Sequence, residues 1–280
     1  MKKILLVCIY NFYQWKGNVR VVCTFLLLLG YLFSILRPIR EFCALVQEPC
    51  TPWVFPFITS EPTCVMLLML LFILLLCDIP FLYPDQKYVL FRAGKKHWIC
   101  GQVLYAGMVS FLFWVTVLIG SVLSLLPQLT ASHQWGKVLY TLSQTAQVGD
   151  IFFFFAIDYK LIVGFSPVQA CLIAFLLAWL VSFWLAELML FLNMWGIKSL
   201  GIMFGLFFIL FQNFAELASG YWVYKLSPVS WMSMSFLNFS AGKNNMPSFS
   251  SSVFLLSCSI CLLFALIFQR MRRYSIDLFS

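Results

Sequence analysis

The chain has 280 residues, of which 62% are hydrophobic and only 10% carry a charge. A soluble domain has about 25% charged residues, so this composition excludes a water-soluble globular protein and indicates a chain that folds in a lipid bilayer. The net charge of +8 comes without a soluble surface on which basic residues alternate with stacking aromatic side chains, and nucleic-acid binding is therefore excluded as well.

The N-terminal segment, residues 2–18, is too polar to cross a membrane, but it carries apolar residues at helical spacing: Ile4, Cys8, Phe12 and Trp15. Polar residues lie on another face of the same helix: Asn11, Gln14 and Asn18. This pattern predicts an amphipathic helix that lies in the cytoplasmic membrane interface. No small-residue cleavage site follows it, so we expect the segment to be retained.

Six apolar runs predict six transmembrane helices, at residues 19–36, 63–82, 102–126, 167–192, 197–217 and 252–269. An α-helix needs about 20 residues to cross the hydrocarbon, with a range of about 17 to 25. Val65–Leu76 shows no alternation of apolar and polar residues, which excludes the strands of a β-barrel. No long polar tract remains for a separate domain, so residues 1–280 are predicted to form one all-α integral membrane domain.

The distribution of Lys and Arg predicts the orientation of these spans. Twelve fall on one side of the predicted membrane: Lys2, Lys3, Lys16, Arg20, Lys87, Arg92, Lys95, Lys96, Lys198, Arg270, Arg272 and Arg273. Six fall on the other: Arg37, Arg40, Lys137, Lys160, Lys225 and Lys243. The positive-inside rule places the larger group, and with it both termini, in the cytoplasm. Contact with anionic head groups accounts for the positive net charge and makes the bilayer an expected partner.

The predicted outer loops carry their own signals. Five prolines exclude a long helix in Arg37–Pro62, and three cysteines near this loop, Cys43, Cys50 and Cys64, could form at most one disulfide among themselves. In the loop 127–166, Ile151–Ile157 is too short to cross, so we expect an interfacial or re-entrant segment there. Ser227–Phe236 predicts a short helix near the outer surface.

The cytoplasmic loop 83–101 is the best-marked polar segment. It combines apolar, basic and aromatic residues around one glycine, and its candidate docking residues are Tyr88, Phe91, Arg92, Gly94, Lys95, Lys96, His97 and Trp98. This pattern predicts a short helix followed by a basic turn, attached to the membrane at both ends. An acidic partner could dock there and act on two spans at once. Alternatively, the loop is basic only because of the orientation rule.

A few polar residues fall at membrane depth: Glu187, Gln212, Asn213 and Glu216. A charged residue at mid-membrane costs about 2.5–3.5 kcal/mol, which about fifteen apolar neighbours at roughly 0.3–0.6 kcal/mol each offset. These residues could line a substrate path or join helices by hydrogen bonds. The alternative is that the two glutamates lie near the ends of their helices and touch water.

Catalytic motifs are missing from the sequence. It contains two histidines, His97 and His133, on opposite sides of the predicted membrane, and no H-E-x-x-H or G-x-S-x-G pattern. We therefore expect no enzyme activity and no bound metal or cofactor. Since the P-loop pattern is also absent, any ATP must be bound by another protein.

The layout of the whole chain resembles the permease subunits of type-2 ABC exporters. It shares their interfacial N-terminal helix, six spans with both ends inside, a basic loop with a glycine before span three, and a large outer segment before span six. The closest local similarities are Lys87–Tyr105 (KYVLFRAGKKHWICGQVLY) and Leu226–Phe236 (LSPVSWMSMSF). The chain departs from the family at Gln102, where a basic residue is common, and in the greater length of the loop 127–166.

The resemblance implies a permease of an ATP-driven exporter in the plasma membrane of a bacterium. Tyr88–Trp98 would include the coupling helix that contacts a separate ABC ATPase subunit, and a second permease copy or a homologous permease would complete the pathway. The alternative is a multi-span membrane protein that acts by interaction, such as an immunity or assembly factor. An intramembrane enzyme that uses Glu187 and Glu216 ranks third.

Overall fold

The computed structural model describes residues 1–80, 86–145, 147–148, 151–195, 199–217, 221–239 and 246–273. Within these residues the regular secondary structure is helical, apart from one hairpin of two-residue strands and two isolated β-bridges. This confirms the predicted helical membrane architecture. The central helices are α2 (Val19–Ile35), α5 (Pro62–Leu76), α7 (Lys95–Leu123), α10 (Pro167–Asn193), α11 (Leu200–Leu217) and α13 (Phe249–Arg273).

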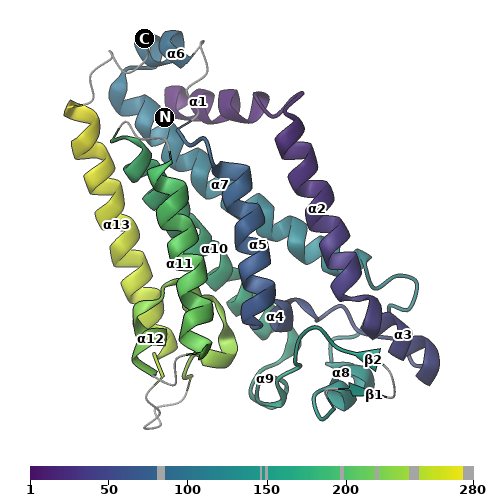
Figure 1. Cartoon of the computed structure of the whole chain (residues 1–280). Helices are drawn as coiled ribbons and strands as arrows, with labels where there is room; N and C mark the ends of the chain where they lie inside the picture. Colours follow the sequence, from purple (N-terminus) through teal and green to yellow (C-terminus); the bar gives the residue numbers. More distant parts are fainter. Residues whose placement is uncertain are drawn as a thin grey trace.

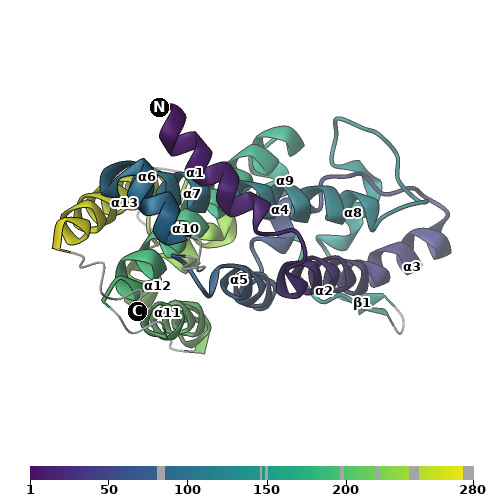
Figure 2. The same ribbon diagram turned by 90° about the horizontal axis from the view of Figure 1, so that it is seen from above.

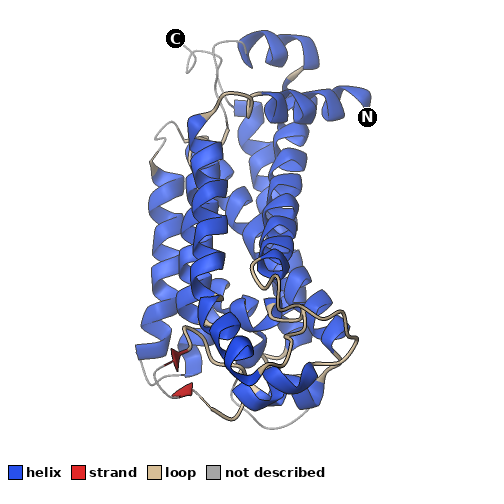
Figure 3. Cartoon of the chain, turned by 90° about the vertical axis from the view of Figure 1, so that its right-hand side faces the viewer, coloured by secondary structure: helices blue, strands red, loops and turns tan. Residues whose placement is uncertain are grey.

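The remaining elements are short and lie at the two ends of this bundle (Figures 1 and 3). At one end lie α1 (Lys2–Tyr13) and α6 (Gln86–Ala93). At the other lie α3 (Arg37–Val46), α4 (Phe55–Ile58), α8 (Gly136–Leu142), β1 (Gln147–Val148), β2 (Ile151–Phe152), α9 (Tyr159–Gly164) and α12 (Tyr221–Leu226). Two 3-10 helices, η1 (Val229–Met232) and η2 (Met234–Phe236), follow α12. We call the end that holds α1 and α6 the α6 end, and we call the opposite end the α3 end.

Four helical segments have the length and apolar composition to cross a membrane: Val19–Val46 (α2 continued by α3), Lys95–Leu123, Pro167–Asn193 and Phe249–Met271. The apolar helices α5 and α11 are shorter than the predicted spans 63–82 and 197–217. Helix α5 ends at Leu76 rather than Leu82, since Asp78 and Pro80 follow closely and proline cannot continue a helix. Residues 81–85 and 196–198 lie outside the described part of the chain.

Helix α10 is the centre of the bundle, since it packs against α5, α7, α11 and α13 (Figure 2). Its buried face includes small residues, Ala170, Ala174 and Ala178, which allow neighbouring helices to approach closely. Trp114 of α7 donates from its Nε1 to the Ser182 hydroxyl at 2.9 Å. The helix begins as its sequence predicts, with Pro167 in the first turn after a capping box formed by Ser166 and Gln169.

The α3 end agrees with the predicted loops in part. The first loop contains only the short helices α3 and α4, as its prolines predict. Ser227–Phe236 contains η1 and η2, so the predicted short helix is two 3-10 turns. Ile151–Ile157 begins as strand β2, and its Phe155 and Ile157 are buried while Phe154 is exposed. The segment therefore belongs to the end layer with α8 and α9 (Figure 1), not to the helix bundle.

The predicted interfacial helix is confirmed as a helix, α1, that lies across the end of the bundle (Figure 1). Val7 and Cys8 are buried, whereas Leu5, Leu6 and Ile9 are exposed. The predicted polar face is wrong at one position, because Asn11 is buried on the side that faces α7. Gly101 of α7 permits the close crossing, since a Cβ there would lie 2.6 Å from the Val7 Cβ.

This crossing predicts that Gly101→Ala lowers thermal stability. The added methyl group must displace Val7 or the backbone of α1, and overpacking of this kind costs about 1–3 kcal/mol. Gly30→Ala on α2 is the matched control, since a Cβ at Gly30 meets no heavy atom within 4 Å and alanine is the better helix former. The measurement is the unfolding temperature in detergent. Equal temperatures for both variants would contradict the crossing.

Candidate docking surface on helix α6

Helix α6 presents two aromatic side chains on its outer face. Tyr88 is 76% exposed and Phe91 is 68% exposed, and they stand three residues apart, on one side of the helix. Gln86 and Leu90, four residues apart, are buried on the opposite side. The eight-residue helix is therefore held to the protein by one face and offers its aromatic face outward.

The basic residues continue this exposed surface onto the start of α7. Arg92 is exposed in the last turn of α6, and Lys96 and His97 are exposed in the first turn of α7. Between the two helices Gly94 adopts φ +81°, a left-handed conformation that glycine adopts without steric cost. Lys95 is half-buried and begins α7. We call Tyr88, Phe91, Arg92, Lys96 and His97 the α6 surface.

Trp98 does not belong to this surface, contrary to the sequence-based prediction. Its side chain is fully buried, and its Nε1 donates a hydrogen bond to Gln86 Oε1 at 2.8 Å. The position of Trp98 could not be predicted, because an aromatic residue at the start of a span can face either the membrane interface or the protein. Trp98 therefore anchors α6 to α7.

A chain of buried amides extends this anchor to α1. Gln86 Nε2 donates to Asn11 Oδ1 at 2.8 Å, and Asn11 Nδ2 donates to Gln102 Oε1 at 3.0 Å. Asn11, Gln86 and Gln102 are each at most 2% exposed. A buried polar group left without a partner costs about 1–3 kcal/mol, so these bonds define one position of α6 against α1 and α7. We call Asn11, Gln86, Trp98 and Gln102 the amide network.

Aromatic side chains extend the same contact along α1. Trp15 Nε1 donates to the Tyr105 hydroxyl at 2.6 Å, and the ring of Phe12 packs edge-on against Tyr105, 4.8 Å between centroids. Cys8 Sγ lies 3.7 Å from Met108 Sδ. A displacement of α6 would therefore also move the first turns of α7 and helix α1.

The amide network accounts for a glutamine rather than a basic residue at position 102. A basic side chain there would bring an ammonium or guanidinium group into a fully buried site facing Asn11, where no carboxylate takes part in the network. Sequence reasoning missed Asn11, Gln86 and Gln102 as site residues. The available signal was weak: a glutamine within an apolar run, and an asparagine in the last turn of helix α1, which was predicted to be amphipathic.

The polar residues at membrane depth are not joined to one another. Glu187 is 1% exposed, and both of its carboxylate oxygens lack a hydrogen-bond partner among the described residues. Its side chain points into the bundle. The prediction that Glu187 touches water near the end of its helix is therefore wrong. Gln212 is also 1% exposed, and neither its Nε2 nor its Oε1 has a hydrogen-bond partner among the described residues. The Asn213 amide faces Met66 of α5. The side chain of Glu216 lies outside the described part of the structure.

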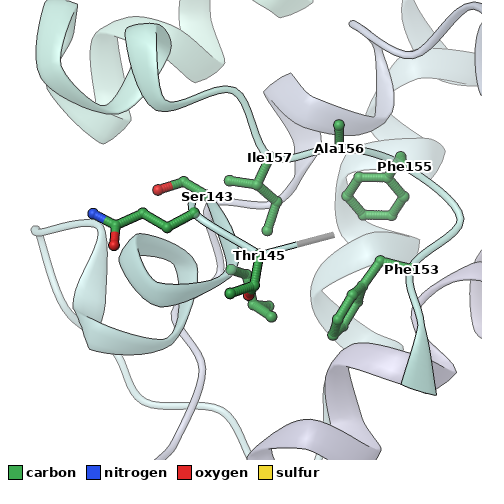
Figure 4. Close-up of a pocket in the computed structure, with 8 residues that line it drawn as sticks. Ser143, Thr145, Phe153, Phe155, Ala156 and Ile157 are labelled. Atoms are coloured by element: carbon green, nitrogen blue, oxygen red, sulfur yellow. The ribbon is translucent and has the colours of Figure 1, made fainter. Parts of the chain in front are cut away.

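The α3 end contains a separate cavity of about 320 Å³ (Figure 4). Its walls are Leu142, Ser143, Gln144, Thr145, Phe153, Phe155, Ala156 and Ile157. The hydroxyls of Ser143 and Thr145 donate to backbone carbonyls of α8, so they are already satisfied. The described residues include no group of three or more metal-ligating side chains. The cavity lies away from the α6 surface and adds no chemistry to it.

We predict that Asn11→Leu loosens α6 while the bundle remains folded. The substitution leaves Gln86 Nε2 and Gln102 Oε1 buried without their partners, at about 1–3 kcal/mol each. Hydrogen exchange of residues 86–93 in detergent should accelerate by about tenfold or more. Gln14→Leu, at the C-cap of α1 and outside the amide network, is the control and should leave exchange unchanged. Equal exchange in the two variants would show that the network does not hold α6.

No protein-family model, no curated protein and no solved structure matches this chain. What the protein does is therefore inferred from its own residues and contacts.

Proposed function

We propose that the protein is the permease subunit of an ATP-driven ABC exporter, and that the α6 surface docks on a separate ATPase subunit. The observation that carries this proposal is the combination of an exposed Tyr88–Phe91 pair with the buried amide network behind it. Two large aromatic side chains held outward on a short helix are suited to fill pockets on a partner protein. The rigid attachment of α6 to α7 gives such a partner mechanical access to a helix of the bundle.

The distribution of charge supports a cytoplasmic position for the α6 surface. Among the described residues, eleven Lys and Arg belong to the segments at the α6 end, and five belong to the α3 end and its loops. Basic residues are retained on the cytoplasmic side of short loops. An ATPase works in the cytoplasm, where ATP is present, and the α6 surface would then be within its reach.

The proposed topology has six crossings, with α5 and α11 as short spans. A helix of 15 residues, as in α5, is about 22 Å long, against a hydrocarbon thickness of about 30 Å. The two short helices, α5 and α11, pack against each other. The difference between helix length and hydrocarbon thickness is therefore confined to one part of the bundle. A bilayer can thin beside short helices at a modest cost, which makes the arrangement compatible with a membrane.

In the proposed mechanism, closure of two ATPase subunits moves α6 laterally. The amide network passes this movement to the first turns of α7 and to α1. Helix α7 packs on α10, the central helix, through Trp114 and Ser182. A tilt of α7 would therefore change the packing around α10 and alternate access between the two sides. A second permease copy or a homologue would supply the other half of the pathway.

A static interaction protein is the second candidate function, and it is favoured by the isolation of Glu187 and Gln212. Their side chains are buried without polar partners among the described residues, so they do not line a continuous polar path in this chain alone. An assembly or immunity factor would use the same α6 surface for docking without nucleotide hydrolysis. Copurification of a partner without ATPase activity would favour this function.

The docking proposal predicts that the double variant Tyr88→Ala and Phe91→Ala loses the ATPase partner. The wild-type protein, purified in mild detergent from its own cells, should retain a subunit that hydrolyses ATP. The double variant should retain at least tenfold less, because its two largest docking side chains are gone. The measurement is the ATPase activity and subunit ratio of the purified complex.

Phe154→Ala is the control for this experiment, since Phe154 is an exposed aromatic residue at the opposite end of the molecule. It should retain the partner fully. The docking proposal is wrong if no ATPase accompanies the wild-type protein, or if the double variant retains it as well as Phe154→Ala does.

The orientation predicts opposite locations for two reporters. A fluorescent protein that matures only in the cytoplasm, fused after Ser280, should be fluorescent. Alkaline phosphatase, active only outside the cytoplasm, should be active when inserted after the exposed residue His133. The reverse pair of results would show that the α3 end is cytoplasmic and that the α6 surface cannot reach an ATPase.

A further inference from the structure

Three cysteines gather near the α3 end, and the structure gives them different partners. The side chains of Cys43 and Cys50 face each other beyond the end of α3, whereas that of Cys64 faces Tyr31. All three are buried. We propose that Cys43 and Cys50 form an intramolecular disulfide on the outer side of the membrane, and that Cys64 stays a free thiol.

The backbone between the two cysteines is built to bring them together. Helix α3 ends at Val46, and the C-cap residue Gln47, whose φ of +55° is left-handed, reverses the chain. Cys43 lies in the last turn of that helix, and Cys50 follows three residues after the reversal. The two thiols therefore meet across a short closed turn, without any need for a distant segment to move.

Cys50 is held in place from its other side. Its backbone N–H donates to the Gln128 carbonyl at 2.8 Å, and its carbonyl accepts from the Thr130 N–H at 2.8 Å. The Thr51 hydroxyl next to it donates to the Trp135 carbonyl at 2.7 Å. Cys50 is thus part of a strand-like contact with the chain that follows α7, and this contact keeps it beside the end of α3 in the folded protein.

The position of α3 relative to the membrane allows oxidation. Helices α2 and α3, joined at Leu36, together cover the 28 residues Val19–Val46, about 42 Å of helix at 1.5 Å per residue, which exceeds the hydrocarbon thickness of about 30 Å. Helix α3 carries an exposed ion pair between Arg37 and Glu41 at 2.7 Å. Helix α3 therefore extends beyond the hydrocarbon, and disulfides persist where the surroundings are oxidising, as outside the cytoplasm.

The chemistry is thiol–disulfide exchange with an oxidised thiol oxidoreductase. One cysteine, as its thiolate, attacks a sulfur of the oxidant's disulfide; this forms a mixed disulfide and releases one thiol of the oxidant. The second cysteine then attacks the mixed disulfide, so that the Cys43–Cys50 bond forms and the oxidant leaves as a dithiol. The two cysteines lose two protons and two electrons, which the oxidant takes up. Because both thiols are buried in the folded protein, the exchange takes place before α3 has packed.

The bond would fasten the outer layer to the membrane helices. Phe42, next to Cys43, packs edge-on against Phe153 of the loop after β2, with 6.2 Å between the ring centroids. On the other side of the turn, Glu48 accepts a hydrogen bond from Lys137 of α8 at 2.9 Å. The disulfide would keep these contacts in register when the bundle moves. This inference rests on the proposed orientation but not on the docking of an ATPase.

The test is differential alkylation of protein from membranes of cells with an oxidising outer compartment. Acid quenching traps the thiols, N-ethylmaleimide labels the free ones under denaturing conditions, and iodoacetamide labels those released by subsequent reduction. Mass spectrometry of the peptides should find Cys43 and Cys50 labelled by iodoacetamide in most molecules and Cys64 labelled by N-ethylmaleimide. Labelling of both Cys43 and Cys50 by N-ethylmaleimide in most wild-type molecules would overturn the proposal.

Two single variants identify the pair. Cys43→Ser should shift Cys50 to the N-ethylmaleimide label, whereas Cys64→Ser should change neither Cys43 nor Cys50. Persistence of the iodoacetamide label on Cys50 in Cys43→Ser would mean that Cys50 has another partner and would also overturn the proposal. The reporter fusions distinguish a wrong orientation from a wrong pairing, and loss of ATPase copurification would leave the alkylation pattern unchanged.

Discussion

The close approach of α1, α6 and α7 depends on a few buried amide hydrogen bonds. Asn11 stands between Gln86 and Gln102 and bonds to both, so one side chain joins three helices. Hydrophobic packing alone would not fix α6, because an eight-residue helix with two exposed aromatic residues buries little apolar surface. A hydrogen bond, by contrast, has a preferred distance and direction. The amide network therefore defines a single position for α6, and the outward aspect of Tyr88 and Phe91 follows from it.

The membrane character and the helical architecture were predictable because they depend on composition and on the length of apolar runs. The starts of α2, α10 and α13 lie within about three residues of the predicted ones. The start of α7 was predicted seven residues late, at Gln102 rather than Lys95, because Lys95, Lys96 and His97 look like a loop. In the structure these three residues form the first turn of α7. The end of α5 at Leu76 was missed because the apolar run continues past Pro80.

The candidate site was predictable in its exposed half only. Tyr88, Phe91 and Arg92 stand out because aromatic and basic residues alternate in a short segment between two spans. The buried half depends on which residues meet in three dimensions, and the periodicity of a single segment does not contain that information. Asn11 was assigned to a water-facing side because it is polar, yet its partners at positions 86 and 102 make burial favourable. For Glu187 the sequence left open whether it touches water near the helix end or faces other helices, and the packing of α10 at the centre of the bundle places it inside.

The two ends of the molecule are built by different interactions, and this difference bears on how the bundle can move. At the α6 end, α6 is attached by the side-chain hydrogen bonds of the amide network, which define one position of the helix. At the α3 end, Cys50 is held by backbone hydrogen bonds on both sides and Trp53 Nε1 donates to the Ser132 carbonyl at 2.6 Å. A force applied at α6 is therefore passed on to α1 and α7 through the amide network, while the layer at the far end is tied by backbone hydrogen bonds. The helices between them would pivot about the α3 end, so that the largest movements occur at the α6 end, where α7 begins.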